Sequence, residues 1–271
     1  MNIINMKDAL VMGIVNITPD SFFKGSRAQT VEGCLSKVEK MISDGVDIID
    51  LGGMSSRPGA EELSVEEECL RLIEPLEAIR SSYPELLISI DTYRTGVLEA
   101  CLPYNINMIN DISGGRLDEG FLPLVAKSKL TYVLMHMQGA PRVMQIKPTY
   151  DDVVLDILKY TDERINYCNS LGIYDIIVDP GFGFGKTLSD NYRLLNGLGA
   201  FKIFNMPIMV GLSRKSMIYK ALDTDASDAL NGTTALHMVA LQHGAKILRV
   251  HDVKEAVHLS LIHISEPTRP Y

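Results

Sequence analysis

Polar residues follow eight short apolar runs of the chain. They are Asn16, Asp50, Asp91, Asn110, His136, Asp179, Ser213 and Arg249. A single polar residue at such a point is usually a cap or a turn residue. Eight of them behind eight apolar runs are hard to explain in that way. Side chains of these types can instead bind a polar ligand and stabilise charge on it.

Asp91, Asn110 and Asp179 form the group best suited to a flat heterocycle. A carboxylate accepts two parallel hydrogen bonds from an amidine-like N–C–N edge, and an asparagine offers both a donor and an acceptor. Carboxylates also bind metal ions, so a metal site or a structural role is the alternative interpretation.

Arg249 and His251 form a cationic group, which would lie near Asn16 if the last strand pairs with the first. The guanidinium fork of an arginine matches phosphate oxygens, and loops at the end of a barrel often bind phosphate. The competing interpretation is an ordinary ion pair of Arg249 with Asp252 or Asp111.

Three loops carry further candidates, at residues 55–59, 181–186 and 213–216. None of them matches a Walker A sequence, and no GxGxxG follows the first apolar run. GxSxG and HExxH are absent as well, so serine hydrolases and zincins lack support. Glycines in 181–185 let the backbone turn tightly, and Pro180 ends the preceding strand. Lys186 follows the glycines, which suits a loop-ordering or surface role.

The polar residues need elements that hold them in place. Strands are expected at 10–15, 46–51, 87–90, 108–109, 132–135, 176–179, 207–211 and 247–248. Helical spacing and caps predict helices between them, for example at 30–45, 64–81, 95–101, 150–171 and 228–243. The alternation predicts an α/β fold of one domain, a (β/α)8 TIM barrel. Its active site would lie where the C-terminal ends of the strands meet.

Composition sets outer limits. The chain has 271 residues, of which 46% are hydrophobic, enough for a substantial core. No apolar run approaches the ~18 residues of a membrane span, and the start lacks the features of a signal peptide. Four scattered cysteines suggest reduced thiols of a cytoplasmic protein. The net charge of −8 argues against general nucleic-acid binding, and an anionic substrate would need a local cluster of cations.

Taken together, the motifs resemble those of the bacterial dihydropteroate synthases, a pterin-binding TIM-barrel family. The motifs lie, in family order, at 13–22, 52–59, 110–112, 135–139, 179–186, 213–216 and 249–252. The resemblance covers roughly residues 11–257. It is specific as a set, although each motif alone is weak.

The resemblance implies a transferase of folate biosynthesis. It would condense 6-hydroxymethyl-7,8-dihydropterin diphosphate with p-aminobenzoate, giving 7,8-dihydropteroate and pyrophosphate by a dissociative displacement. It also implies Mg²⁺ as cofactor, sulfonamides as competitors of p-aminobenzoate, and a cytoplasmic homodimer.

The resemblance also assigns residues. The pterin would be held by Asp91, Asn110, Ile112, Met135, Asp179, Gly211 and Lys215. The aminobenzoate would be bound by Phe22, Ser56, Arg57, Pro58, Phe184, Ser213 and Lys215. The diphosphate would contact Asn16, Ser56, Arg249 and His251, with Asn16 also binding the metal. The catalytic group would be Asp91, Lys215, Arg249 and His251.

The chain departs from the family in three places. Met54 replaces a common glutamate, and Ser56 replaces a common threonine while keeping the hydroxyl. The barrel domain is expected at 1–259. Residues 260–271 are expected to be an irregular or non-native tail, because Pro267 and Pro270 end any helix and the sequence resembles adapter read-through. A truncated last helix would affect dimerisation most.

Two other functions compete. A methyltetrahydrofolate–corrinoid methyltransferase shares the pterin-binding barrel, which would explain Asp91, Asn110 and Asp179 but not the cationic loops. A non-catalytic pterin- or phosphate-binding protein with a decayed site is the second alternative, and the cations at Lys215 and Arg249 argue against it.

Overall fold

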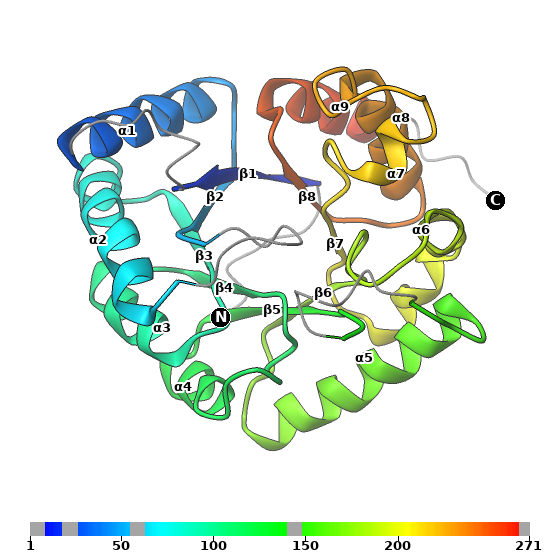
Figure 1. Ribbon diagram of the computed structural model, residues 1–271, viewed down its shortest axis with the longest axis horizontal. Coiled ribbons are helices and arrows are strands. Elements are labelled where there is room, and N and C mark those ends of the chain that lie inside the picture. Colours follow the sequence, from blue (N-terminus) through cyan, green and yellow to red (C-terminus); the bar gives the residue numbers. More distant parts are fainter. Residues whose placement is uncertain (1–8, 18–26, 55–62, 140–147, 266–271) are drawn as a thin grey trace.

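The computed structural model describes residues 9–17, 27–54, 63–139 and 148–265. Eight strands form the inner wall of a ring and helices surround them (Figure 1). The strands are β1 (Leu10–Asn16), β2 (Ile48–Gly52), β3 (Leu87–Asp91), β4 (Met108–Asp111), β5 (Thr131–Met135), β6 (Ile176–Asp179), β7 (Met209–Val210) and β8 (Ile247–Val250). This confirms the predicted barrel.

Every neighbouring pair of strands is parallel, in the order β6-β5-β4-β3-β2-β1-β8-β7. The first and last strands pair from Leu10↔Ile247 to Gly13↔Val250. Between β6 and β7 the ladder is reduced to one bridge, Val178↔Ile208. Because all strands run in one direction, their C-terminal ends form a single rim.

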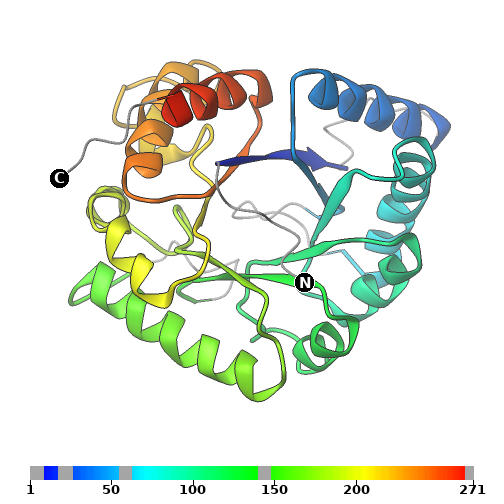
Figure 2. The same ribbon diagram turned by 180° about the vertical axis from the view of Figure 1, so that it is seen from behind.

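The helices of the outer layer follow the strands in turn, as the view from behind also shows (Figure 2). They are α1 (Arg27–Ser43), α2 (Val65–Ser82), α3 (Thr95–Cys101), α4 (Phe121–Ser128), α5 (Val153–Ser170), α6 (Leu188–Asn196), α7 (Ser216–Tyr219), α8 (Leu230–Gln242) and α9 (Val253–Ser265). Two 3-10 turns, η1 (Leu102–Tyr104) and η2 (Leu198–Phe204), complete the connections.

Local signals explain several helix ends. Ser64 accepts from the amide of Glu67 while the Glu67 carboxylate accepts from the amide of Ser64, so the predicted capping box starts α2. Thr187 and Asp190 form a second capping box that starts α6, which the sequence analysis did not assign. Helix α1 begins at Arg27, three residues before the predicted Thr30.

The strands are buried on both faces, which explains why their sequences are continuous apolar runs. The barrel interior is filled by one cluster: Met12, Ile48, Met108, Val133, Ile177, Met209 and Ile247. A larger cluster fills the layer between strands and helices. Each fully buried aliphatic side chain contributes roughly 1.5–3 kcal/mol, so this double layer fixes the rim rigidly.

Helix α9 continues to Ser265, past the boundary expected after residue 259. Residues 266–271, with both prolines of the tail, lie outside the described part of the chain. Among the described helices none is long and apolar enough to cross a membrane.

Candidate active site

Arg249 of β8 lies at the centre of the rim, between two carboxylates. Its Nε donates to Oδ2 of Asp50 at 2.6 Å, and its Nη2 donates to Oδ2 of Asp91 at 2.6 Å. Asn110 Nδ2 donates to the same Asp50 oxygen at 3.0 Å. The barrel thus joins polar residues from β2, β3, β4 and β8.

The competing interpretation of Arg249 as a partner of Asp252 or Asp111 is wrong in both parts. Asp252 is paired with Arg214. The Asp111 carboxylate accepts from the amides of Ser113 and Gly115, each at 2.6 Å, and from the Tyr132 hydroxyl at 2.7 Å. Asp111 is therefore a buried residue whose carboxylate is bonded to the turn that follows β4 and to Tyr132.

Burial and charge oppose each other in this group. Burial acts to lower the pKa of Arg249, but Asp50 and Asp91 outweigh it and the pKa is raised. Burial raises the pKa of Asp91 to about 7, against the attraction of Arg249. Asp50 is fully buried, and its Oδ1 has no hydrogen-bond partner within the described residues. Two carboxylates therefore share the single guanidinium of Arg249.

Asp179, Lys215 and Phe184 form a second group on the rim. Asp179 is 5% exposed, and its Oδ1 accepts from the amide of Gly181 at 2.8 Å. Lys215 Nζ donates to the Phe182 carbonyl and lies 4.7 Å from the centroid of the Phe184 ring. Burial lowers the pKa of Lys215 to about 8, and the charge of Asp179 partly restores it. An ammonium, a carboxylate and an aromatic face therefore meet in one place.

Apolar residues border this group. Ile112 and Met135 share a small buried cluster with Met137, against which Phe184 packs. A Cβ on Gly211 would lie 3.8 Å from Lys215 Nζ, so this glycine also adjoins the lysine. The structure thus brings the predicted pterin residues together, between β4, β5, β6 and the loop after β7.

Ser213 and His251 form the third group. The Ser213 hydroxyl accepts from the His251 amide at 3.1 Å and lies 3.2 Å from its Nδ1. Ser213 is buried, whereas His251 is exposed at the rim. In this arrangement Ser213 orients His251, and the contact of Ser213 with aminobenzoate stays a prediction.

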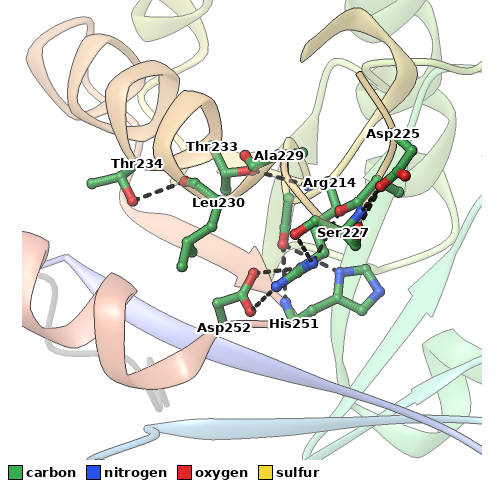
Figure 3. A network of polar contacts seen from close by, with 11 residues as sticks. Arg214, Asp225, Ser227, Ala229, Leu230, Thr233, Thr234, His251 and Asp252 are labelled. Atoms are coloured by element: carbon green, nitrogen blue, oxygen red, sulfur yellow. Dashed lines mark hydrogen bonds and ion pairs between the residues drawn. The ribbon is translucent and has the colours of Figure 1, made fainter. Parts of the chain in front are cut away.

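Arg214 anchors the loop that carries Ser213 and Lys215 (Figure 3). It binds both Asp252 oxygens, from Nε at 2.9 Å and from Nη2 at 2.8 Å. Its Nη1 donates to the carbonyls of Ala226 and Ser227 at 3.0 Å each. The backbone of Arg214 is left-handed, with φ of 54°, a conformation that is uncommon for residues other than glycine.

Asn16 ends β1 beside the first group. A Cβ on Gly52 would lie 3.5 Å from Asn16 Oδ1 and 3.7 Å from Asp91 Oδ2, so two oxygens face the bare backbone of Gly52. Mg²⁺ prefers oxygen ligands and often takes only one or two from the protein when phosphates supply others. The donor set at Asn16 fits that ion. The described residues contain no cluster of three or more His, Cys, Asp or Glu that could hold a metal.

His136 and Lys186 are buried side by side beneath the rim. Lys186 Nζ lies 3.0 Å from His136 Nδ1, and Lys186 is 4% exposed. Burial lowers the pKa of His136 to about 2, with Lys186 and Arg116 adding to the effect. His136 is therefore neutral and no general base. The surface role considered for Lys186 is wrong, because the lysine folds inward.

Four predicted residues, Phe22, Ser56, Arg57 and Pro58, lie outside the described residues. Sequence reasoning also missed two that matter. Asp50 was noted only as a strand end, although a carboxylate in a buried run was a signal. The burial of Lys186 had no local signal, because it depends on how the glycine loop folds back.

The family profile described as pterin binding enzyme matches residues 12–251. The dihydropteroate synthase of Escherichia coli is 45% identical over 249 residues, covering 91% of this chain and 88% of that protein. The chain belongs to the dihydropteroate synthases. Solved structures agree with this membership. The Yersinia pestis dihydropteroate synthase, crystallised with a sulfonamide drug complex, has a TM-score of 0.90 and 39% identity, covering 96% of this chain and 94% of that one.

The dihydropteroate synthase of Xanthomonas albilineans, in complex with 7,8-dihydropteroate, has a TM-score of 0.88 and 35% identity. That comparison covers 99% of this chain and 97% of the other. The dihydropteroate synthase fold therefore extends over nearly the whole chain, including the three groups on the rim.

Proposed function

We propose that this chain condenses 6-hydroxymethyl-7,8-dihydropterin diphosphate with p-aminobenzoate to give 7,8-dihydropteroate and pyrophosphate. The observation that carries this proposal is the meeting of Asp179, Lys215 and Phe184 beside the Arg249 group. A carboxylate for a heterocycle, an ammonium, an aromatic wall and an arginine for phosphate are the parts that this condensation needs.

The pterin is bound by its hydrogen-bonding edge. Asp179 and Asn110 are short side chains on separate strands, and both are at least 95% buried. Asp179 keeps Oδ2 for a ligand, since the Gly181 amide takes Oδ1. Ile112 and Met135 supply the apolar surface against which a flat ring packs. Buried polar groups of this kind hold a heterocycle in one orientation.

The reaction breaks the carbon–oxygen bond between the pterin methylene and the diphosphate, and pyrophosphate leaves with the electron pair. Electron donation from the reduced ring stabilises the positive charge on the methylene. The amino nitrogen of p-aminobenzoate then forms the new carbon–nitrogen bond and loses a proton. The protein supplies no covalent nucleophile, because positioning and charge stabilisation are sufficient for such a displacement.

Arg249 is the cation for the leaving group, and His251 lies beside it at the rim. Arg249 is bound to Asp50 and Asp91 without substrate, so a diphosphate must compete with those carboxylates for the guanidinium. Desolvation and the charge of Arg249 lower the pKa of His251 to about 4, so we propose that it meets the outer phosphate as a neutral hydrogen-bond donor. We propose that Asn16 would hold Mg²⁺, which would neutralise part of the charge on the diphosphate.

Aminobenzoate fits beside Phe184 and Lys215. A carboxylate-bearing aromatic ring can pack on the phenyl face while the ammonium attracts it. Ser213 and the predicted residues Phe22, Ser56, Arg57 and Pro58 would complete this pocket. The Yersinia pestis relative was crystallised with a sulfonamide drug complex, and we propose that sulfonamides compete for the same pocket here.

The test is pyrophosphate release from purified protein with Mg²⁺. Release must require both pterin diphosphate and p-aminobenzoate, and sulfanilamide must slow it in competition with p-aminobenzoate. Chelation of Mg²⁺ with EDTA should lower the rate, and added Mg²⁺ should restore it. Methyl transfer from methyltetrahydrofolate to a corrinoid, without pyrophosphate chemistry, would refute the assignment.

We also propose a homodimer, as the family resemblance implies. Sedimentation equilibrium would give about twice the 30.0 kDa of the chain. A monomer that remains active would show that pairing is dispensable for the reaction.

A further inference from the structure

Lys186 has an unusual environment for a lysine. Its ammonium donates to the carbonyls of Gly181 at 2.7 Å and Phe184 at 3.0 Å, and it meets His136 Nδ1 at 3.0 Å. None of its hydrogen-bond partners in the described part of the chain is a carboxylate. Burial lowers the pKa of Lys186 well below its usual value, and the charge of Asp179 partly opposes this shift. A buried amino group without hydrogen bonds is costly, so the two carbonyls and His136 are the contacts that keep Lys186 in this place.

The contacts of Lys186 lie on one short segment, residues 181–185, called here the glycine loop. The loop packs closely on the end of β5. A Cβ on Gly181 would lie 1.9 Å from the His136 carbonyl oxygen, and one on Gly185 would lie 2.6 Å from that of Gln138. Buried carbonyls need donors. Lys186 supplies a donor to two carbonyls of the loop itself, those of Gly181 and Phe184.

The same loop carries the substrate groups. The Gly181 amide fixes Asp179, and Phe184 provides the aromatic wall. The Phe182 carbonyl, between the two carbonyls that Lys186 holds, accepts from Lys215. Two lysines therefore donate hydrogen bonds to carbonyls of the same loop. Lys186 bonds to Gly181 and Phe184, and Lys215 bonds to Phe182.

We propose that Lys186 is a positioning residue of the reaction, which holds the glycine loop so that Asp179, Phe184 and Lys215 keep their mutual geometry. This inference rests on the proposed function. In this proposal Lys186 acts through the loop and not by contact with a substrate. A displacement of the loop would move Asp179, which would bind the pterin, and Phe184, which would contact the aminobenzoate. Both residues depend on the segment that Lys186 holds.

A matched control comes from Arg80, which clamps backbone carbonyls at the opposite end of the barrel. Its guanidinium donates to the carbonyls of Pro84 at 2.6 Å, Leu86 at 2.9 Å and Asn105 at 2.9 Å. Arg80→Met and Lys186→Met each remove a nitrogen donor group and its contacts with backbone carbonyls. Of these two residues, only Lys186 contacts the loop that carries candidate site residues. Tyr150→Phe removes one outer tie of the loop, the bond to the Gly185 carbonyl at 2.7 Å.

The experiment measures three quantities for each variant of the full chain: thermal midpoint, calorimetric Kd for 6-hydroxymethylpterin, and kcat and KM for both substrates. We expect both methionine variants to lower the thermal midpoint. Lys186→Met alone should weaken pterin binding, raise KM for p-aminobenzoate and reduce kcat/KM about a hundredfold, as small misplacements of reacting groups do. Tyr150→Phe should shift the same constants in the same direction by less.

A folded Lys186→Met protein with wild-type Kd, kcat and KM would overturn the proposal, as would equal kinetic losses in Arg80→Met. If Lys186→Met does not fold, Lys186→Arg takes its place. Its planar donors cannot reproduce the ammonium contacts, so wild-type pterin affinity in that variant would overturn the proposal too. Wild-type protein that binds the pterin but releases no pyrophosphate contradicts the proposed function instead, and the pterin affinities still decide the role of Lys186.

Discussion

Asp50 Oδ2 and Arg249 Nε lie 2.6 Å apart, although the two residues are separated by 199 positions in the sequence. This ion pair links β2 to β8, the two strands that flank β1 on opposite sides. Asp91 binds the other arm of the same guanidinium. The guanidinium of Arg249 therefore lies between two carboxylates, which would compete with a diphosphate for it.

Replacing Arg249 tests this group. In Arg249→Met the diphosphate loses a charged donor, which should raise the barrier by about 2–4 kcal/mol, or lower kcat roughly 30- to 1000-fold. The variant should also be less stable, since Asp50 and Asp91 lose their counter-ion. Arg249→Lys keeps the charge without the fork and should fall between the two. Steady-state kinetics at a temperature where all three are folded would check the order, and an unimpaired Arg249→Met would contradict the role.

The pH dependence of kcat/KM tests Lys215. Burial lowers its pKa to about 8, so its ammonium is lost as the pH rises through that value. We expect kcat/KM to fall above about pH 8. Because the unfolded chain keeps this proton up to its ordinary 10.5, the free energy of unfolding should rise with pH between these values. Lys215→Arg stays charged and should remove the alkaline limb of the activity profile. The same limb in that variant would assign it to another group.

Phe184 tests the aminobenzoate wall. Lys215 Nζ lies over its ring at 4.7 Å. Phe184→Leu removes the aromatic face, and an aromatic ring pair is worth about 0.5–1.5 kcal/mol, so KM for p-aminobenzoate should rise roughly two- to thirteenfold. Phe204→Leu, which breaks a ring contact with Phe201 in η2, is the matched control and should leave KM unchanged. A larger change in the KM for pterin diphosphate would place Phe184 in the other pocket.

Two glycines separate backbone strain from steric clash. Gly181 and Gly172 both have positive φ, of 73° and 88°. A Cβ on Gly181 would strike the His136 carbonyl, whereas one on Gly172 would meet nothing within 4 Å. Gly172→Ala should cost about 1–2 kcal/mol of stability, the strain of a left-handed residue, and keep full activity. Gly181→Ala should cost more and abolish turnover. Urea unfolding and the pyrophosphate assay would distinguish them, and equal losses would refute the clash.

The fold was predictable because its signals are local. Apolar runs end in polar residues, and the Ser64–Glu67 box marks a helix start at the residue where α2 begins. The position of the candidate site was predictable too, because parallel strands bring their C-terminal ends together. The ion-pair partners of Arg249 were not predictable from the sequence. Nearby Asp252 and Asp111 looked equally suitable, and only the register of distant strands selects Asp50 and Asp91.

Lys186 shows the same limit from another side. Glycines beside a lysine indicate an open, solvated loop when only neighbours in the sequence are considered. The positive φ angles of Gly181, Gly183 and Gly185 instead fold the segment back over its own lysine. The role of Asp111 was also not predictable from its neighbours in the sequence. Its carboxylate accepts hydrogen bonds from backbone amides two and four residues further on.

The single bridge between Val178 and Ile208 makes the boundary between β6 and β7 the most weakly paired joint among the described strands. One side of this joint carries Asp179, and the other leads to Lys215. Amides along β6 and β7 should therefore exchange with deuterium sooner than those of the fully paired β1 and β2. A pterin that binds Asp179 and Lys215 at once would act as a staple across the joint. Substrate binding would then slow exchange on both strands, so that the closed ring is completed by the molecule it holds.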